Sequence, residues 1–445
     1  MSLNDTPRAN RVHIGIFGRT NSGKSSLINA LTGQQAALVS SHCGTTTDPV
    51  FKAMEIHGIG PCVFIDTAGF DDTGLLGGLR VRATLEAVKK TDIALLVLTG
   101  VPDASEQSWL KRLQAQKIPV IPVLNQCDRL GEQADDVCRQ VQDAISGQPA
   151  GSNAVAASTP EPATAGGSHS TPEPATTTGA APADHPVSRQ PAPAPIMVSA
   201  LTGQGIDRLR QAIVRALPED MGNENITGAL ARPGDVILLV MPQDIQAPKG
   251  RLILPQVQTI RELLDRKCSV LSCTADTFEA TLSILKAPPV LIITDSQVFK
   301  AVYEKKPEES RLTSFSVLFA AYKGDGAYFR ESARAIGQLT PGSRVLIAEA
   351  CTHAPLSEDI GREKIPAMLR RRIGADLTID MFSGQDFPDK LDGYDLIIHC
   401  GACMFNRKYV LSRVDQARMA GVPMTNYGMA IAWLQGILEH IEIPG

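Results

Sequence analysis

The sequence predicts an α/β fold, in which a P-loop nucleotide-binding domain is followed by two smaller α/β domains with mostly parallel sheets. Three observations support this prediction. The apolar run VHIGIF leads directly into the glycine loop GRTNSGKS. Later apolar runs such as VILLVM, VLIIT and YDLIIHC alternate with helical patterns, which is typical of parallel strands joined by crossover helices. The chain has 445 residues, which is too long for one hydrophobic core.

The composition is that of an ordinary folded protein and excludes several classes of function. With a net charge of -4, the chain lacks the basic excess that binding to a nucleic-acid backbone needs, so we expect no nucleic-acid partner. No apolar run approaches the roughly 20 residues that cross a bilayer, so we expect no membrane partner and a cytoplasmic location. Nine cysteines are too sparse for a disulfide framework. In a reducing compartment, a close cysteine pair therefore favours metal binding or redox chemistry.

Residues 148–195 differ from the rest of the chain, because they are rich in Ala, Pro, Thr, Ser and Gly and contain STPEPAT twice. Such a segment cannot bury enough apolar surface to offset its ordering entropy, so we expect no fixed conformation. The stretch IMVSALTGQGIDRLRQAIVRAL beyond it completes the N-terminal domain, which makes the segment an insertion in a loop. The expected domains are 1–227, 228–322 and 323–445.

The glycine loop after the first predicted strand has the pattern G-x-x-x-x-G-K-S and leads into the helical SSLINAL. Backbone N–H groups of such a loop fold around phosphates at the N-terminus of a helix. The lysine of the pattern, Lys24, reaches the outer phosphates, and the hydroxyl of Ser25 can hold Mg²⁺. The candidate phosphate-binding residues are Gly18, Asn21, Ser22, Gly23, Lys24, Ser25 and Ser26.

Three later motifs, DTAG, NQCD and VSA, indicate a guanine rather than an adenine nucleotide. Asp66 of DTAG would bind Mg²⁺ through water, and Gly69 would face the γ-phosphate. Asp128 of NQCD would accept hydrogen bonds from N1–H and the amino group of guanine, which penalises adenine. The other candidate residues of the guanine pocket are Asn125, Ser199 and Ala200.

The order and spacing of these motifs resemble the translation-factor-like GTPases of the Era and TrmE type, with GTTTD at 44–48 in the place of their switch I. The resemblance implies hydrolysis of GTP with Mg²⁺. Its catalytic residues would be Lys24, Thr46 and Gly69, and Thr46 would join Ser25 as a Mg²⁺ ligand. A neighbouring threonine of the same GTTTD stretch could fill the role of Thr46 instead.

Two positions refine this resemblance. In TrmE-like members an asparagine at the position of Asn21 helps to bind K⁺, so Asn21 would be a potassium ligand and hydrolysis would depend on that ion. Gln126 stands where the family usually has a lysine that packs along the base. This departure leaves the strength of guanine binding open.

A second group of candidates lies at the ends of two predicted strands near the C-terminus. Cys351 and His353 follow RVLIAEA, whereas His399, Cys400 and Cys403 follow YDLII. Because parallel strands deliver their carboxyl ends to one edge, the three cysteines can converge there. Three thiolates and a weaker ligand can hold zinc or an iron–sulfur cubane with one open iron. The CxxC pair alone could also serve thiol redox chemistry.

The combination of these cysteines with the GTPase motifs resembles the HydF maturases of FeFe-hydrogenases over nearly the whole chain. The resemblance implies a middle dimerisation domain, a homodimer, and a scaffold that passes a diiron precursor to apo FeFe-hydrogenase. The precursor would come from radical-SAM maturases. Cys351, Cys400 and Cys403 would ligate a 4Fe-4S cluster, with His353 or His399 as a candidate labile fourth ligand.

Two other functions stay open at this point. One is a TrmE-like GTPase in RNA modification or ribosome assembly, whose C-terminal cysteines bind zinc. The other is an interaction protein that binds GTP and barely hydrolyses it. The lack of a basic excess argues against RNA as a partner.

Overall fold

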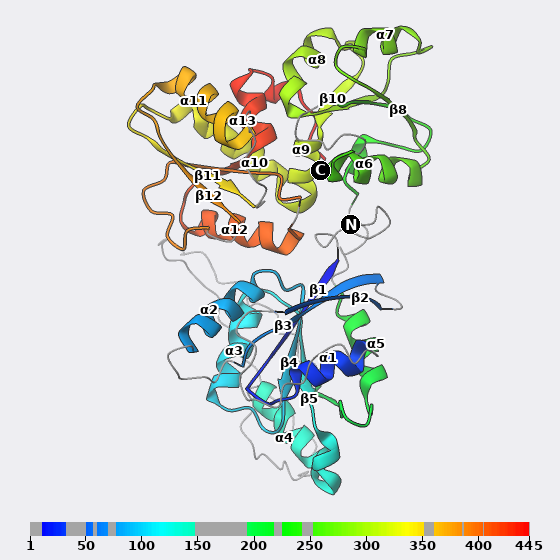
Figure 1. The fold of residues 1–445 in the computed structure, drawn as a ribbon, viewed down its shortest axis with the longest axis vertical. Helices are drawn as coiled ribbons and strands as arrows, with labels where there is room; N and C mark the ends of the chain where they lie inside the picture. The colour runs from blue at the N-terminus through cyan, green and yellow to red at the C-terminus, as the bar shows by residue number, and fades with distance from the viewer. Residues whose placement is uncertain are drawn as a thin grey trace, which may run out of the picture.

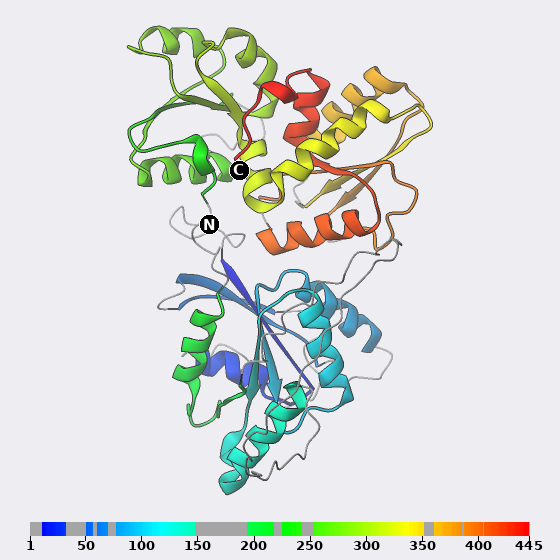
Figure 2. The same cartoon turned by 180° about the vertical axis from the view of Figure 1, so that it is seen from behind.

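The structure is a computed structural model that describes residues 11–32, 50–56, 60–69, 77–146, 194–217, 225–242, 252–350, 360–384, 387–403 and 405–444. It contains three sheets with helices around them, and only one pair of strands is antiparallel among the described pairs. Figure 1 shows the N-terminal sheet below, with the other two sheets next to each other above it, and Figure 2 shows the same arrangement from behind. The predicted fold class is confirmed.

The N-terminal sheet has six strands in the order β2-β3-β1-β4-β5-β6. Only β2 runs antiparallel to its neighbour, β3. The strands are β1 (Val12–Gly18), β2 (Val50–Ile56), β3 (Gly60–Asp66), β4 (Ile93–Leu98), β5 (Val120–Leu124) and β6 (Ile196–Met197). The helices are α1 (Lys24–Thr32), α2 (Gly77–Val88), α3 (Ala104–Ala115), α4 (Ala134–Ser146) and α5 (Ile206–Arg215).

Both faces of this sheet are covered, because side chains alternate along its buried strands. Along β4, every second residue joins the core beneath α1 and α5, and the residues between them join the core beneath α3 and α4. β6 pairs in parallel with β5, and α5 follows it. The segment beyond the predicted insertion therefore completes the N-terminal sheet, as its sequence pattern predicts. The insertion itself, apart from Ala194 and Pro195, lies outside the described residues.

The second and third sheets each have four strands, and all of their pairings are parallel. The second has the order β10-β9-β7-β8 and the third β12-β11-β13-β14. The strands of the second sheet are β7 (Val236–Val240), β8 (Ser269–Cys273), β9 (Leu291–Thr294) and β10 (Arg311–Ser314). Those of the third are β11 (Arg344–Glu349), β12 (Thr378–Ser383), β13 (Leu396–His399) and β14 (Met424–Asn426).

The sequence pattern gives no sign of β10 in the second sheet or of β14 in the third. β10 has four residues and β14 has three, and both carry polar residues. Such short, partly polar segments give neither an apolar run nor enough alternating positions for a strand pattern. The helices of this half are α6 (Leu254–Asp265), α7 (Phe278–Ser283), α8 (Phe299–Lys305), α9 (Phe315–Lys323), α10 (Gly326–Ala333), α11 (Ile365–Ile373), α12 (Arg407–Met419) and α13 (Tyr427–Leu434).

Polar side chains fix the starts of several helices. The Asp103 carboxylate accepts from the Glu106 N–H at 2.8 Å, while the Glu106 carboxylate accepts from the Asp103 N–H at 3.0 Å. This reciprocal pair is a capping box, which satisfies two of the free N–H groups at the start of α3. At α13 the Asn426 side chain accepts from Gly428 N–H at 2.8 Å. None of the described helices is long and apolar enough to cross a membrane.

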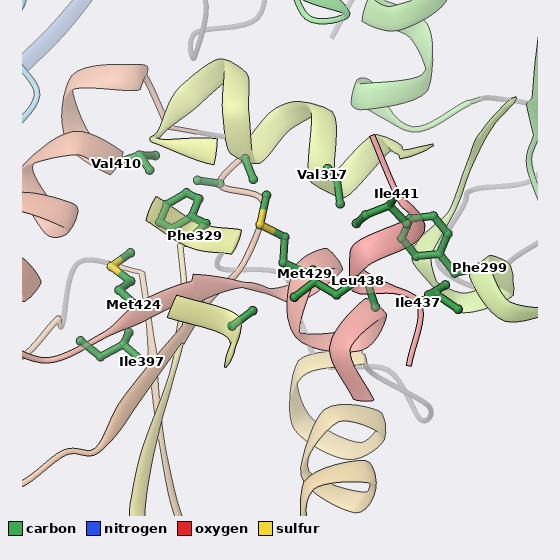
Figure 3. Packing of buried hydrophobic residues seen from close by; sticks show 14 of the residues in the cluster. Phe299, Val317, Phe329, Ile397, Val410, Met424, Met429, Ile437, Leu438 and Ile441 are labelled. Carbon is green, nitrogen blue, oxygen red and sulfur yellow. The ribbon is translucent and has the colours of Figure 1, made fainter. Parts of the chain in front are cut away.

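The second and third sheets share one hydrophobic core. Its buried strand residues come from β7, β9 and β10 of the second sheet and from β11, β13 and β14 of the third. Figure 3 shows Ile437, Leu438 and Ile441 of the C-terminal segment beside Phe299 of α8 and Val317 of α9. The same segment is tied to β10 by a hydrogen bond from the Glu442 N–H to the Leu312 carbonyl at 2.8 Å. The two sheets are therefore packed as one body.

Replacing Phe329 with alanine tests this shared core. The Phe329 ring is 2% exposed and sits in the shared cluster, so the cavity should cost about 3–5 kcal/mol of unfolding free energy. Hydrogen exchange should rise together in peptides from β7–β9 and from β11–β13. Val290→Ala is the control, because this side chain is 37% exposed. Loss of protection confined to the third sheet would contradict a shared core.

Candidate functional site

The phosphate-binding loop joins β1 to α1, as its sequence predicts. Gly23 has φ of +86°, and a Cβ there would lie 2.4 Å from Asn125 Nδ2, so only glycine fits this approach. Asn21 adopts a left-handed φ of +62°, a region that asparagine tolerates better than most residues. Ser22 is buried within the loop, and Ser26 lies half-buried in the first turn of α1.

Lys24 is held at the mouth of this loop. Its side chain is buried, and Nζ donates to the Gly18 carbonyl at 3.0 Å and to the Arg19 carbonyl at 2.7 Å. These contacts keep the ammonium within the curve of the loop, where it can reach a bound phosphate. These hydrogen bonds also offset the free-energy cost of burying the charged ammonium.

Two of the three predicted Mg²⁺-side residues lie together. Ser25 Oγ donates to Asp66 Oδ2 at 2.6 Å, because the parallel pairing of β1 and β3 places Ile16 opposite Asp66. Thr67 Oγ1 donates to the Ile16 carbonyl at 2.6 Å and fixes the start of the DTAG turn. A hydroxyl and a carboxylate at this distance form a suitable pair of oxygens for a hydrated Mg²⁺.

The DTAG turn also runs against the phosphate loop. A Cβ at Gly69 would lie 2.6 Å from the backbone nitrogen of Thr20, so the two backbones approach closely at this point. Gly69 therefore stands next to the loop, where the sequence places it. Thr46, the other predicted catalytic residue, lies outside the described residues.

Asn125 connects the phosphate loop to the VSA motif. It is 1% exposed, its Nδ2 donates to the Ser22 carbonyl at 2.9 Å, and its Oδ1 accepts from the Ala200 N–H at 3.3 Å. Ser199 is buried next to it, and its Oγ accepts from the Thr202 N–H at 3.2 Å. Residues from three distant motifs thus meet at one wall of the candidate guanine pocket.

Asp128 lies at the rim of this wall. It is exposed within the short 3-10 turn Cys127–Arg129, and the turn is anchored by the Cys127 N–H, which donates to the Val198 carbonyl at 3.1 Å. Gln126, in left-handed φ of +60°, donates from Nε2 to the Asn21 carbonyl at 3.3 Å. Gln126 therefore bridges to the phosphate loop.

The second candidate site lies at the carboxyl ends of β11 and β13. These strands pair in parallel, with Ala348 opposite His399, and Cys400 follows directly. Cys400 Sγ accepts from the Ala350 N–H at 3.0 Å and from the Ala402 N–H at 3.4 Å. Two N–H dipoles directed at one sulfur favour its thiolate form, which is the form that binds metal.

The loop after Cys400 is held by a lysine from another part of the fold. Ala402 has a left-handed φ of +47°, which is uncommon for a residue with a Cβ. Lys323, the last residue of α9, donates from Nζ to the carbonyls of Ala402 at 3.0 Å, Cys403 at 3.2 Å and Phe405 at 2.9 Å. The loop is therefore fixed before α12 begins at Arg407. The motif does not open a helix as a thioredoxin-like CxxC does.

His399, one of the two predicted candidates for a fourth ligand, has no ring nitrogen available in this arrangement. Arg413 donates to Nε2 at 2.8 Å, so Nδ1 carries the proton and donates to the Cys400 carbonyl at 2.7 Å. Burial, followed by the charge of Arg413, lowers the pKa of His399 to about 3. The ring is neutral in this arrangement, and its hydrogen bonds place it to position Cys400.

The remaining predicted cluster residues, Cys351 and His353, lie outside the described residues. Cys351 is the residue after Ala350, whose N–H donates to Cys400 Sγ. Within the described ranges, no group of three His, Cys, Asp or Glu side chains is placed to hold a metal ion. The described part of the chain thus supplies two of the three predicted thiolates.

A contact between the domains that carry the two sites was not apparent from the sequence. The side-chain amide of Asn406, three residues after Cys403, donates to the Lys90 carbonyl at 2.8 Å and to Asp92 Oδ2 at 3.3 Å. Asp92 also accepts from the His13 N–H of β1 at 2.8 Å. The residues involved are more than 300 positions apart, and no local pattern in the sequence indicates such a pair.

Lys90 reinforces this contact. Its ammonium lies 5.6 Å from the ring centroid of Phe405 and 5.4 Å from that of Tyr409, and burial lowers its pKa to about 8. A cation over aromatic faces is attracted by the ring quadrupole. The junction between α2 and β4 of the first domain thus packs on the segment that follows the CxxC motif.

Comparisons with known proteins find family models that match three parts of the chain. A model described as the hydrogen maturase F tetramerization domain matches residues 327–442, and one described as the hydrogen maturase F dimerization domain matches residues 226–324. A model described as a 50S ribosome-binding GTPase matches residues 13–126. The chain belongs to the hydrogen maturase F (HydF) family. Its first domain is a GTPase domain, which confirms the predicted enzyme class, and its other two matched domains are described by their roles in oligomerisation.

Curated relatives match only part of the chain. GTPase Der of Campylobacter concisus is 38% identical over 137 residues, which are 30% of this chain and 29% of that protein. The tRNA modification GTPase MnmE of Chromobacterium violaceum is 39% identical over 126 residues, 28% of each protein. The chain thus spans under a third of the length of these relatives. A solved structure of Aquifex aeolicus Era aligns with 59% of this chain and 92% of its own, at 17% identity and a TM-score of 0.34.

Asn125→Ala should weaken nucleotide binding without unfolding the domain. The change removes the two hydrogen bonds that hold the phosphate loop against the VSA motif. At about 0.5–1.5 kcal/mol each, their loss should raise the Kd for GDP by roughly 5- to 150-fold. Gln114→Ala, at an exposed position of α3, is the matched control. Titration with a fluorescent GDP analogue measures both, and equal affinities would contradict the role of Asn125.

Proposed function

We propose that the chain is a GTP-hydrolysing scaffold that binds a 4Fe-4S cluster and delivers a diiron precursor to apo FeFe-hydrogenase. Membership of the HydF family supports this proposal. The observation that carries it is the setting of Cys400, whose sulfur lies between the carboxyl ends of β11 and β13 and accepts two backbone N–H groups. N–H groups directed at a thiolate are a common feature of cysteines that hold iron–sulfur clusters.

The residues near Cys400 fit such a cluster. Cys400 and Cys403 come from one loop, and Cys351 follows the Ala350 amide that contacts Cys400. We infer that these three thiolates hold three irons. Since both nitrogens of His399 are engaged, the fourth iron is left to His353 or to water. When bound, the cluster supplies an iron with an exchangeable position, at which the diiron precursor can dock.

In the GTPase domain, we infer that the phosphate loop binds GTP and that hydrolysis gives GDP and phosphate. Lys24 neutralises charge on the outer phosphates, and Gly69 presents its backbone N–H to the γ-phosphate. Ser25 and Thr46 bind Mg²⁺ directly, whereas Asp66 binds it through water. The 2.6 Å contact between Ser25 and Asp66 supports this assignment.

For the base, we infer that Asp128 accepts from the guanine ring edge and that Asn125 holds the pocket wall. Ser199 and Ala200 line the same wall, as the bond between Ala200 N–H and Asn125 suggests. Gln126 takes the place of the usual lysine. Because it reaches the Asn21 carbonyl, it would position the phosphate loop beside the base.

The partners and setting follow from the same proposal. The chain would form a homodimer through the region expected at 228–322, and the family models add a tetramerization domain. Radical-SAM maturases would supply the diiron precursor. We propose domain limits of 1–227, 228–322 and 323–445, and a cytoplasmic location.

Potassium should accelerate hydrolysis if Asn21 binds that ion. Asn21 lies in the phosphate loop in a left-handed conformation, and we infer that its side chain reaches the bound phosphates. We expect hydrolysis to be severalfold faster in KCl than in NaCl for the unaltered protein, because K⁺ adds positive charge beside the β and γ phosphates. The difference should vanish in Asn21→Ala. Equal rates for the unaltered protein in both salts would rule out the potassium site.

The cysteine variants test the scaffold function. Protein reconstituted without oxygen should be brown and should hold about four irons per chain, the number in a 4Fe-4S cubane. Cys400→Ala and Cys403→Ala should each lose most of the iron and all activation of apo-hydrogenase, measured after coexpression with the radical-SAM partners. GTP hydrolysis should stay near that of the unaltered protein, since the phosphate loop lies in another domain.

Cys268→Ala is the matched control for these variants. Cys268 is buried, and its Sγ lies 3.2 Å from the Arg232 carbonyl in the second sheet's core. Its loss should leave the iron content unchanged. A colourless protein that binds zinc in place of iron, or a loaded protein that never activates hydrogenase, would contradict the proposed function.

A further inference from the structure

We propose that Lys323 is a positioning residue for the cysteine loop, and that its ammonium supplies a fixed positive charge beside the cluster thiolates. This inference rests on the proposed function. It assigns a role in the cluster site to the last residue of α9, which falls within the stretch matched by the dimerization-domain model. The cysteines at 400 and 403 fall within the tetramerization-domain match.

The geometry of Lys323 supports this role. The residue ends α9 and is 2% exposed, so its ammonium is almost completely removed from water. Nζ donates to the carbonyls of Ala402, Cys403 and Phe405, at 3.0, 3.2 and 2.9 Å. Three donors on one ammonium are matched by three acceptors on one loop. Burying an ammonium group is costly unless its N–H donors are hydrogen-bonded, and these three carbonyls provide such partners.

The contacts of Lys323 act on the sulfur through the conformation of Ala402. This residue stands between the two cysteines with a φ of +47°, which carries a steric cost for an alanine. That conformation directs its N–H toward Cys400 Sγ at 3.4 Å, while its carbonyl points at Lys323. The lysine thus holds the peptide groups in the orientation that one of the two N–H···S contacts needs.

The charge of Lys323 has a second effect. Its hydrogen bond to the Cys403 carbonyl places the ammonium next to the backbone of a proposed ligand. Reduction adds a negative charge to a cluster, and a nearby cation in a medium of low dielectric stabilises that charge. Lys323 should therefore raise the reduction potential of the cluster. A role limited to packing would leave the potential unchanged.

The chain offers a matched control in Lys306. Its Nζ also donates to three carbonyls, those of Pro307 at 3.1 Å, Glu308 at 3.3 Å and Ser310 at 2.8 Å. Lys306 caps a loop of the second domain that contains none of the predicted cluster residues. Loss of either lysine removes three similar hydrogen bonds, but only loss of Lys323 acts on the cysteine loop.

The test compares Lys323→Met, Lys323→Gln and Lys306→Met in the full chain. Each protein is reconstituted with iron and sulfide without oxygen, and its iron content, resistance of the cluster to a chelator and reduction potential are measured. In Lys323→Met we expect severalfold faster loss of iron and a more negative potential. Lys323→Gln keeps N–H donors without the charge, so it should retain more iron but show the same shift of potential. Lys306→Met should match the unaltered protein in both measurements.

The outcomes separate this inference from the function on which it rests. If the unaltered protein holds a cluster and both Lys323 variants keep its potential and its iron, the role of Lys323 is wrong and the scaffold function stands. If the unaltered protein takes up no 4Fe-4S cluster, the scaffold function and this inference both fail. Should Lys323→Met fail to fold, the potential of Lys323→Gln decides alone. A shift of equal size in Lys306→Met would also overturn the inference.

Discussion

Parallel strand pairing is the constraint on which both candidate sites depend. Parallel strands point their carboxyl ends toward one edge of a sheet, so residues far apart in sequence come together there. In the first sheet this pairing places Ser25 and Asp66 within 2.6 Å of each other. In the third it places Cys400 beside the end of β11. The geometry of each site therefore depends on how the strands are paired, and no single continuous motif contains all of its residues.

The segment from Cys400 to Asn406 is held by contacts from two other parts of the fold. Lys323 binds its carbonyls from the end of α9, and the Asp92 carboxylate of the first domain binds the Asn406 side chain. Buried His399 holds its start through the Cys400 carbonyl. A buried polar network is costly unless every member is satisfied, and these contacts satisfy most of the loop's backbone acceptors. The conformation of the cysteine loop thus depends on the packing of elements that carry no cysteine ligand themselves.

The shared core explains how Lys323 can take part in the cluster site. Matches of the family models divide the C-terminal half near residue 325, but the hydrophobic cluster runs across that boundary. Met429 and Leu438 pack in the same cluster as Phe299 and Val317, as Figure 3 shows. Burial of apolar surface across the boundary fixes α9 against the third sheet. Lys323, at the end of α9, can therefore hold the cysteine loop that follows β13 of the third sheet.

The sequence by itself determined the fold class, the phosphate loop and its Mg²⁺-side residues, and the position of the CxxC motif at a strand end. These features depend on local patterns, such as glycine spacing and runs of buried strand residues, which need few distant partners. Only the tertiary structure decided that His399 is neutral and engaged at both ring nitrogens. It also decided that Asn406 meets Asp92 and that Lys323 holds the cysteine loop. The contacts of Lys323 and Asn406 join residues about 80 and more than 300 positions apart. They form only because distant elements pack against each other, and no local spacing in the sequence encodes that packing.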